Sequence, residues 1–433
     1  MKKAKVISII ALVILSVFSF VSCSMTLTGE SAMDGGGFHS PSGSFKGDYD
    51  MSEDAAPSDS EADDTAEGEV ENKPEEVQRP AGLITASAWN DNDYFDLYRK
   101  LFEQGSENED SGKFFDFENW GFSTYDRIKV TVVCGENKVA GAEVVAVSND
   151  GEEYKAVTDS NGVAYIFAEN TNGQITVSSG EYTANAEYTK DSDEITVELS
   201  GYAEKKNKIE LMFVVDVTGS MGDELSYLKN EIADVVSRVA ANNSTAEISL
   251  ALLFYRDLDD KEQFKYHDFV NVSAADGIKT VISYIDAQKA TGGGDYPEAV
   301  DEALEMAVNA QWSSGATTKI IFQILDAPPH NNDENKTCFN SSVSVAAEKG
   351  IRICPILCSG ADTRTEYVMR EAAVMTAGTF IFVTDDSGIG GAHHDPDIPN
   401  ATVEALNSLL VRVINGYYTG TFADPVDWRQ EIK

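Results

Sequence analysis

One stretch, residues 209–239, constrains the fold more than any other part of the chain. Residues 209–215 are mostly apolar, form a run too short for an independent helix, and lead directly into a polar loop. Apolar side chains then return at helical spacing, at Leu225, Leu228, Ile232, Val235, Val236 and Val239. This pattern predicts a buried strand, a polar loop and an amphipathic helix in succession.

The loop carries three oxygen-bearing side chains at alternating positions, Asp216, Thr218 and Ser220. Such alternation can turn one carboxylate and two hydroxyls to the same side of the loop, at the carboxyl end of a strand. That edge is the usual ligand crevice of a parallel α/β sheet. Hard oxygen ligands suit Mg²⁺, Mn²⁺ or Ca²⁺ rather than a metal that prefers thiolates. We therefore predict a divalent-cation site here, with Mg²⁺ as the expected ion.

Strand and helix patterns alternate from Lys208 to about Gly420, which predicts a doubly wound α/β fold. The further strands are expected at 248–255, 264–272, 319–325, 351–357 and 379–383, and the helices at 277–287, 297–312, 341–349, 366–375 and 401–413. Pro297 suits the first turn of its helix. Asp326 ends an apolar strand as Asp216 does, so the two carboxylates should face each other across the carboxyl edge of the sheet.

The sequence Asp216-Val-Thr-Gly-Ser220 resembles the metal-ion-dependent adhesion site of the von Willebrand factor A domain, whose signature is Asp-x-Ser-x-Ser. Gly-Gly-Gly-Asp-Tyr-Pro-Glu and Asp-Ala-Pro-Pro-His follow, as in the hemicentin and alpha-kinase subgroup. The resemblance implies a Rossmann-like A domain at 205–420, followed by a tail at 421–433, with Asp326 holding the metal through water. Where the family presents a Thr, this chain has no hydroxyl, so Asp295 is the expected substitute and Thr291 the alternative.

A cation held by neutral hydroxyls and water-bridged carboxylates stays electrophilic, so it can accept an acidic side chain from a partner protein. We therefore expect metal-dependent adhesion or protein binding and no enzyme activity. One alternative is a metal-independent structural protein that assembles at the cell envelope. A serine hydrolase with Ser220 as nucleophile and His330 as base is less favoured, because a nucleophile elbow requires Gly where Thr218 stands.

The N-terminal residues predict export. Residues 1–22 are typical of a secretory signal peptide, with Lys2, Lys3 and Lys5 before an uncharged run, and Phe20-Val-Ser-Cys23 resembles a bacterial lipobox. We expect Cys23 to carry the lipid that anchors an extracytoplasmic protein to the membrane. Residues 23–80, rich in Asp, Glu, Ser and Gly, are expected to form a disordered tether. The formal charge of −40, from 73 acidic and 33 basic residues, argues against nucleic acid as a partner.

Two segments lie between the tether and the A domain. Residues 81–125 are rich in aromatic side chains, which are expected to pack against a neighbouring domain, with a carbohydrate platform as the alternative. Residues 126–200 show short alternating strands separated by Asn-Gly and Asp-Gly turns, which predicts a small antiparallel β-sandwich. It resembles carboxypeptidase-regulatory-like or collagen-adhesin B-type domains.

Several polar or reactive side chains remain outside these assignments. Cys134, Cys354 and Cys358 are expected to be thiols, and one disulfide from Cys338 stays open as an alternative. Loop capping is the expected role of His393 and His394, and a second metal or proton-handling site is the alternative.

Overall fold

The computed structural model describes residues 83–103, 112–168, 171–258, 260–315, 317–388, 390–396, 398–399 and 401–431. All of them belong to one compact unit, Pro74–Lys433. The predicted signal peptide, the lipidation site Cys23 and the acidic tether lie outside the described residues and stay predictions. Within the described part of the chain, no helix is both long enough and apolar enough to cross a membrane.

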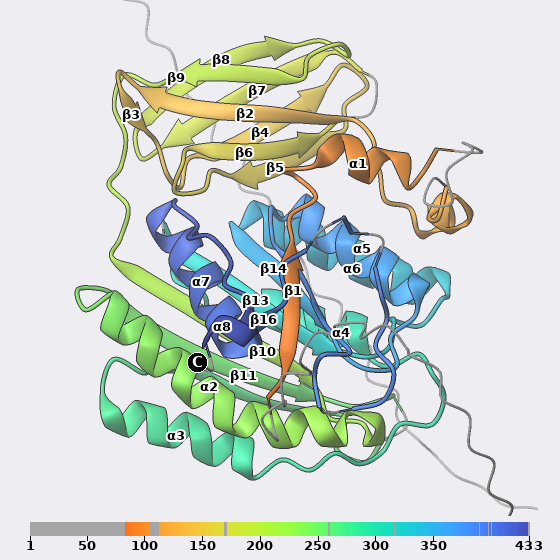
Figure 1. The fold of residues 1–433 in the computed structure, drawn as a ribbon. Helices are drawn as coiled ribbons and strands as arrows, with labels where there is room; N and C mark the ends of the chain where they lie inside the picture. The colour runs from red at the N-terminus through yellow and green to blue at the C-terminus, as the bar shows by residue number, and fades with distance from the viewer. Residues whose placement is uncertain are drawn as a thin grey trace, which may run out of the picture. The chain divides into compact units, whose positions relative to one another are not determined.

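The largest element is a central sheet of eight strands in the order β12-β11-β10-β13-β14-β15-β1-β16 (Figure 1). Its strands are β1 (Thr85–Trp89), β10 (Lys208–Asp216), β11 (Glu247–Tyr255), β12 (Phe264–Asn271), β13 (Thr318–Leu325), β14 (Ile351–Leu357), β15 (Phe380–Val383) and β16 (Glu404–Ala405). The five strands from β11 to β15 in this order are parallel, whereas β12, β1 and β16 pair antiparallel with their neighbours. The sheet is therefore mixed but mostly parallel.

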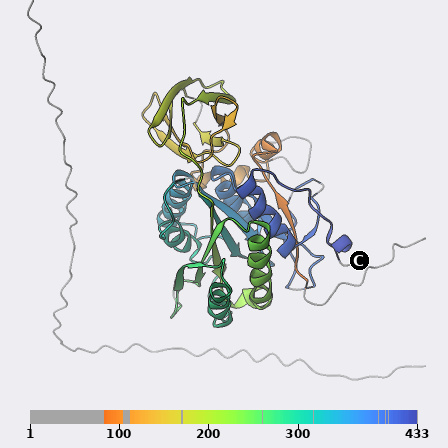
Figure 2. The ribbon, with the colours of Figure 1, turned by 90° about the vertical axis from the view of Figure 1, so that its left-hand side faces the viewer.

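Helices cover both faces of this sheet (Figure 2). They are α2 (Gly222–Asn242), α3 (Ala275–Asp286), α4 (Val300–Val308), α5 (Asp333–Glu348), α6 (Thr363–Met375) and α7 (Leu406–Thr419), and a short α8 (Trp428–Glu431) follows. The core on one face is shared with α2, α3 and α7, and the core on the other face with α4, α5 and α6. The predicted doubly wound α/β fold is confirmed.

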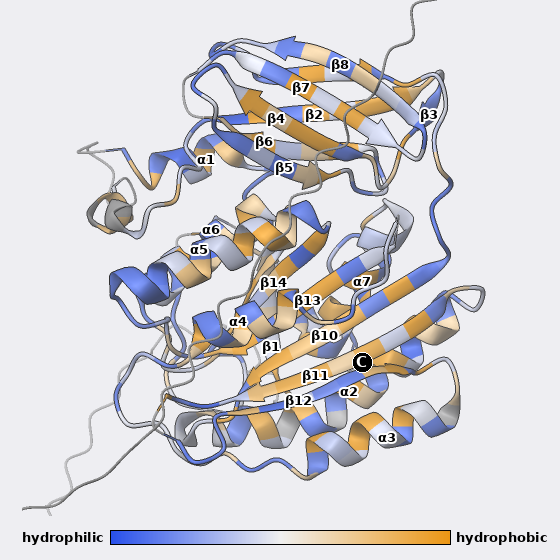
Figure 3. Cartoon of the chain, turned by 180° about the vertical axis from the view of Figure 1, so that it is seen from behind, coloured by the Kyte–Doolittle hydropathy of each residue, from blue (hydrophilic) through white to orange (hydrophobic). Residues whose placement is uncertain are grey.

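Strand β10 shows why the central strands read as continuous apolar runs. Leu211, Phe213 and Val215 enter the core beneath α2 and α7, while Met212 and Val214 enter the core beneath α4 and α6. Because side chains alternate between the two faces and both faces are covered, most positions are apolar. The buried Glu210 is an exception, and it accepts hydrogen bonds from Ser313 and pairs with Lys208. Figure 3 shows the resulting hydrophobic colouring along β10, β11, β13 and β14.

Three predicted helix starts are wrong. The helix expected at 341–349 begins eight residues earlier, at Asp333, where the Asn332 side chain caps its first turn. The helix expected from Pro297 begins at Val300, because the residues before it form a loop. In this loop Glu298 forms an isolated β-bridge with Pro329, which lies in the loop after β13. The helix expected from residue 401 begins at Leu406, because Glu404 and Ala405 form β16 against β1. In these last two cases a long-range backbone pairing makes the helix begin later than its sequence pattern predicts.

The described part of the aromatic-rich segment is built into the α/β domain. Strand β1 inserts between β15 and β16, and is followed by α1 (Phe95–Lys100) and a 3₁₀ helix at Phe115–Trp120. Tyr98, Phe114 and Trp120 are buried in the same core as α6. Tyr367 of α6 is surrounded by rings from this segment, at 5.2 Å from Phe114 and at 5.4 to 6.1 Å from Phe102, Phe117 and Phe122. The α/β domain thus starts before residue 205 in sequence.

Residues 127–198 form a β-sandwich of two four-stranded sheets. One contains β2 (Arg127–Cys134), β3 (Asn137–Lys138), β6 (Val163–Phe167) and β9 (Glu194–Glu198), and the other β4 (Glu143–Ser148), β5 (Glu153–Val157), β7 (Gly173–Ser179) and β8 (Tyr182–Tyr188). Apolar side chains from both sheets share one core. The sandwich is not purely antiparallel as predicted. After β8 the chain crosses to the first sheet, where β9 pairs with β2 in parallel.

The four cysteines of the described residues, Cys134, Cys338, Cys354 and Cys358, are all free thiols. Cys354 and Cys358 are buried in the core beneath α2 and α7, as expected for small hydrophobic side chains. The alternative of a disulfide from Cys338 is therefore not realised among the described residues.

Candidate metal site at the carboxyl edge of the sheet

Asp216, Thr218 and Ser220 lie together where β10 ends. The backbone N–H and the hydroxyl of Thr218 donate hydrogen bonds to Oδ1 of Asp216, at 2.8 and 2.7 Å. The hydroxyls of Thr218 and Ser220 are 3.3 Å apart. A 3₁₀ turn, Gly219–Met221, leads directly into α2, and the buried Met221 anchors it to the core. The predicted grouping of one carboxylate with two hydroxyls is therefore present in the structure.

Asp326 follows β13, the strand that pairs with β10. Its side chain accepts a hydrogen bond from Ser220, and its charge raises the pKa of Asp216. Because both aspartates end neighbouring parallel strands, they meet at the same edge of the sheet. The two carboxylates predicted to face each other are thus linked through two hydroxyls, because Thr218 donates to Asp216 and Ser220 contacts both Thr218 and Asp326.

Burial and a neighbouring carboxylate both disfavour the ionised form of Asp216. Burial, and then the like charge of Asp326, raise the pKa of Asp216 to about 7, although hydrogen bonding from Thr218 and the nearby Tyr255 hydroxyl opposes this shift. The approach of Tyr255 does not reach good hydrogen-bond geometry, so the buried Oδ2 atom of Asp216 is left without a well-formed hydrogen bond among the described residues. An unsatisfied buried carboxylate is unfavourable. A divalent ion beside Oδ2 would remove this penalty, so the residues present fit a metal.

The loop that carries the predicted third element lies against this turn. Thr291 N–H donates to the carbonyl of Val217 at 3.0 Å, and Gly219 N–H donates to the carbonyl of Gly292 at 3.1 Å. The side chains of Thr291 and Asp295 are both exposed. The structure therefore brings the loop to the site, and the choice between Asp295 and Thr291 as the metal-binding side chain stays a prediction.

Glu298 is a site residue that sequence reasoning missed. It is only 4% exposed, and a Cβ added to Gly293 would lie 2.9 Å from Glu298 Oε1 and 3.2 Å from the Cβ of Thr218. Burial raises the pKa of Glu298 to about 9, and the nearby charge of Asp216 adds to this effect. Its Oε2 atom has no hydrogen-bond partner among the described residues.

The signal for Glu298 was present in the sequence, as the last residue of Gly-Gly-Gly-Asp-Tyr-Pro-Glu. An acidic residue directly after Pro297 looks like an ordinary first-turn residue of a helix, where carboxylates are favourable. The helix starts two residues later, so Glu298 instead points from a loop into the space beside Gly293.

The histidines near the sheet edge have other partners. Nε2 of His330 lies 3.0 Å from Oδ1 of Asp257, so this histidine is paired with a carboxylate and not with Ser220. His394 Nε2 lies 2.7 Å from Glu366 Oε2, and His393 Nδ1 lies 3.0 Å from Asp385 Oδ1. Among the described residues, no cluster made only of His, Cys, Asp and Glu has a geometry suited to a metal ion. The candidate site differs from such clusters because hydroxyls would supply part of its ligand set.

Comparisons with known proteins agree on the central domain. The family model described as the von Willebrand factor A domain matches residues 210–385. Alpha-protein kinase vwkA of Dictyostelium discoideum is 24% identical over 159 residues, which are 34% of this chain and 25% of that protein. A putative ariadne-like RING finger protein, R811 of Acanthamoeba polyphaga mimivirus, is 31% identical over 140 residues, which are 31% of this chain and 13% of that protein. The chain thus spans a quarter or less of these relatives.

Two solved structures resemble the chain at low similarity. The pilus adhesin SpaC from Lactobacillus rhamnosus GG has a TM-score of 0.33 and 9% identity, over 58% of this chain and 32% of that chain. The conserved hypothetical protein BatB from Bacteroides thetaiotaomicron has a TM-score of 0.27 and 13% identity, over 52% of this chain and 95% of that chain.

The mostly parallel sheet between two helix layers and the position of the polar loop after β10 agree with the family match. Residues 210–385 of this chain form a von Willebrand factor A domain.

Proposed function

We propose that the A domain binds a protein ligand through a divalent cation, with Mg²⁺ as the expected ion and Mn²⁺ or Ca²⁺ as alternatives. Asp216, Thr218 and Ser220 would hold the ion, and Asp326 would support it through water. The observation that carries this proposal is the buried Oδ2 atom of Asp216, which lacks a hydrogen-bond partner among the described residues and faces the like charge of Asp326.

The ligand class follows from the chemistry of such an ion. Two of its protein ligands would be neutral hydroxyls, so the ion would keep net positive charge and attract an additional oxygen ligand. A carboxylate from a partner protein suits that position. With a formal charge of −40, this chain repels an acidic partner at long range, so the bridging ion would be essential to the contact.

Binding is favoured over catalysis by the contacts of Ser220. Its hydroxyl is engaged with Thr218 and Asp326, and the His330 ring nitrogen Nε2 is engaged with Asp257. A nucleophilic serine requires a base within hydrogen-bond reach. We therefore propose a binding module without enzyme activity.

The proposed location rests on the N-terminal sequence. A signal peptide at 1–22 and a lipid on Cys23 would export the chain and anchor it to the membrane, with the folded part outside the cytoplasm. Globomycin treatment of expressing cells, which blocks lipoprotein signal cleavage, should cause the precursor to accumulate. Normal processing of a Cys23→Ala variant would contradict the anchor.

The metal proposal is tested by thermal unfolding of the chelator-treated protein, titrated with Mg²⁺, Mn²⁺ and Ca²⁺. A bound ion should stabilise the parent by about 2.7 kcal/mol at a hundredfold excess over its dissociation constant. Asp216→Ala should abolish the response. Asp276→Ala, which removes an exposed carboxylate on α3, is the matched control and should respond like the parent.

Protein binding is then measured with immobilised Glu-containing and matched Gln-containing peptides, with and without chelator. Capture that requires both the carboxylate and the ion supports the proposal. If no ion stabilises the parent and capture is indifferent to chelator, metal-dependent adhesion is excluded, and metal-independent assembly at the cell envelope becomes the preferred function.

A further inference from the structure

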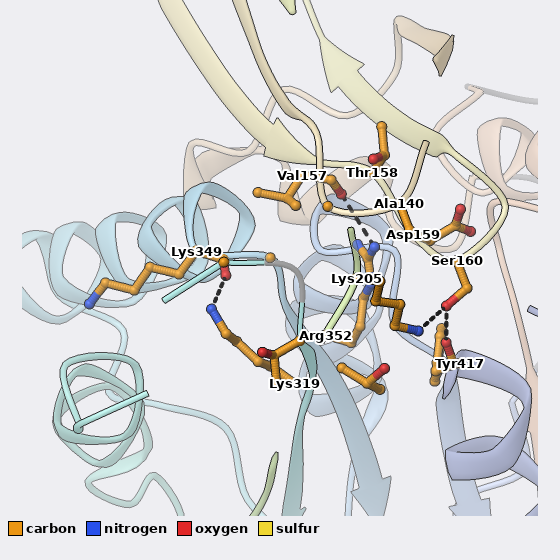
Figure 4. A pocket seen from close by; sticks show the side chains of 15 residues that line it. Ala140, Val157, Thr158, Asp159, Ser160, Lys205, Lys319, Lys349, Arg352 and Tyr417 are labelled. Carbon is orange, nitrogen blue, oxygen red and sulfur yellow. Dashed lines mark hydrogen bonds between the residues drawn. The ribbon is translucent and has the colours of Figure 1, made fainter. Parts of the chain in front are cut away.

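A cavity lined by basic side chains lies at the opposite edge of the sheet from the metal site. It is formed where β13 and β14 begin, and its wall also includes Thr158, Asp159 and Ser160 from the turn after β5 of the sandwich. Lys205, which lies in the connection from β9 to β10, completes the wall. Figure 4 shows the Lys205, Lys319 and Arg352 side chains around this pocket.

The three cations have hydrogen-bond partners but no ion-pair partner among the described residues. Lys205 Nζ donates to Ser160 Oγ and to the Tyr418 carbonyl, both at 2.7 Å. Lys319 Nζ donates to the Lys349 carbonyl at 3.0 Å. Arg352 donates to the carbonyls of Thr376 and Val157, at 2.9 and 3.3 Å. Their direct hydrogen-bond partners are therefore neutral groups, although the charges of Asp159 and Glu210 act at longer range to raise the pKa values of Lys205 and Lys319, respectively.

This arrangement is unusual for buried side chains. Lys319 is 7% exposed and Arg352 is 9% exposed, and such residues are seldom buried without a charged partner. The chain has 73 acidic residues, yet none forms an ion pair with these cations within the described part. Burial also lowers the pKa of Lys205 to about 8. An excess of positive charge is thus concentrated in one cavity of a very acidic protein.

A second observation indicates that the cavity accepts a ligand. Thr317 lines it, and the Thr317 hydroxyl is buried without a hydrogen-bond partner among the described residues. The cavity volume is about 40 Å³. A buried water requires roughly 10 to 15 Å³, so there is room for about three waters or for one compact polyatomic ion.

We propose that this cavity binds a small oxyanion of the phosphate or sulfate type, held by Lys205, Lys319 and Arg352 and by the hydroxyl of Thr317. Guanidinium and ammonium groups both donate strong hydrogen bonds to such oxygens. A tetrahedral anion offers several acceptors at once, so it can contact all three cations without displacing them from their carbonyl partners.

Two further charged residues line the cavity but lie outside the proposed ligand set. Asp159 accepts hydrogen bonds from the backbone N–H groups of Asn161 and Val163 through Oδ1, and its charge partly offsets that of Lys205 without a direct ion pair among the described contacts. The Lys349 side chain points away and donates to the Val308 carbonyl, so it is not part of the proposed ligand set.

The test uses the full chain with inorganic phosphate, sulfate, acetate and chloride at constant ionic strength. Phosphate or sulfate should raise the thermal midpoint in a saturable way, whereas acetate and chloride should have little effect. Arg352→Gln and Lys319→Gln should each weaken the apparent affinity at least tenfold, the loss expected for one charge-assisted hydrogen bond of about 1.4 kcal/mol. Lys279→Gln, on the exposed face of α3, is the matched control.

Equilibrium dialysis of the unsubstituted protein against radiolabelled phosphate gives a reading that requires no variant to fold. Binding of one phosphate per chain, lost in Arg352→Gln, supports the site. The proposal is overturned if no phosphate or sulfate binds, if chloride stabilises equally, or if Lys279→Gln loses as much affinity as Arg352→Gln. Because the metal site is at the other edge of the sheet, Asp216→Ala should leave phosphate binding unchanged.

Discussion

Arg370 holds Asp91 through two parallel hydrogen bonds, from Nε to Oδ2 at 2.9 Å and from an Nη atom to Oδ1, although 279 positions separate the two residues in the chain. Asp91 follows β1, and Arg370 lies on α6. Both side chains are nearly inaccessible to solvent, and Arg370 also pairs with Glu366 at 2.8 Å. This buried pair joins the aromatic-rich segment to the A domain.

We expect Asp91→Asn to lower the free energy of unfolding by about 1.5 to 3 kcal/mol, because the buried Arg370 loses charge-assisted hydrogen bonds and keeps only Glu366 as a charged partner. Urea unfolding monitored by circular dichroism measures the change. Asp96→Asn, an exposed carboxylate on α1, should cost less than about 0.5 kcal/mol. Equal losses for the two variants would show that the Asp91–Arg370 pair does not connect the segment to the domain.

Gly293 separates Glu298 from Thr218, and it has a φ of +77°. An alanine there would be strained in this conformation and would bring its Cβ within 2.9 Å of Glu298 Oε1. We expect Gly293→Ala to lower stability by about 1 to 3 kcal/mol and to reduce cation binding.

Gly294 provides the control for this substitution. A Cβ added to Gly294 has no heavy atom within 4 Å, so Gly294→Ala should bind cations like the parent. Isothermal titration with Mg²⁺ or Mn²⁺ compares the two variants. If both alanines bind cations normally, the close approach at Gly293 has no role in the site.

Glu298 should change its effect on stability when a cation binds. Its folded-state pKa of about 9 exceeds the ordinary value of 4.5, so the unfolded state loses a proton near pH 4.5 while the folded state keeps it. Stability is therefore lost as pH rises from about 4.5 to 9. Glu298→Gln removes this loss and should raise the stability of the metal-free protein at pH 7 by about 1 to 3 kcal/mol.

With saturating divalent cation, Glu298→Gln should lower stability instead of raising it, because the ion would favour the ionised Glu298 over a neutral amide. Thermal midpoints with chelator and with Mg²⁺ or Mn²⁺ test both halves of this prediction. Glu305→Gln, at an exposed position on α4, should change neither midpoint appreciably. A gain for Glu298→Gln that persists with the cation would place Glu298 outside the ion's influence.

A pH effect unrelated to metal is expected from Glu371 on α6. Burial raises the pKa of Glu371 to about 8, against an ordinary 4.5, although hydrogen bonds with Thr124 and Tyr98 oppose the shift. Since the folded state binds the extra proton, this residue's contribution to stability should fall as pH rises from about 4.5 to 8 and be constant above that range. Each unit of difference corresponds to about 1.4 kcal/mol.

Urea unfolding between pH 5 and 9 measures this effect as the difference between the parent and Glu371→Gln. The variant should gain stability relative to the parent as pH rises, and the gain should level off above pH 8. A pH-independent difference would show that Glu371 is ionised in the folded protein.

Much of the A domain could be predicted because its pattern is local. The strand at Lys208–Asp216, the helix at Gly222–Asn242 and the grouping of Asp216, Thr218 and Ser220 all follow from alternating or helical spacing within one short stretch. The placement of Asp326 followed from a general rule, since parallel strands present their carboxyl ends at one edge.

The predictions failed where distant parts of the chain decide the structure. No local signal shows that Thr85–Trp89 joins β15, that β16 shortens the last helix of the A domain, or that Glu298 lies in a loop instead of a helix. The buried cations around Lys205 and Arg352 were invisible for the same reason, because they come from separate elements.

The sequence by itself determined the fold class, the A-domain core and the grouping of one carboxylate with two hydroxyls in one loop, because hydrophobic periodicity and side-chain spacing are properties of neighbouring residues. Only the tertiary structure decided which remote strand completes the sheet, which carboxylates are buried together and where uncompensated charge collects. Burial and electrostatic pairing depend on what surrounds a side chain in space, and a linear sequence does not specify those neighbours.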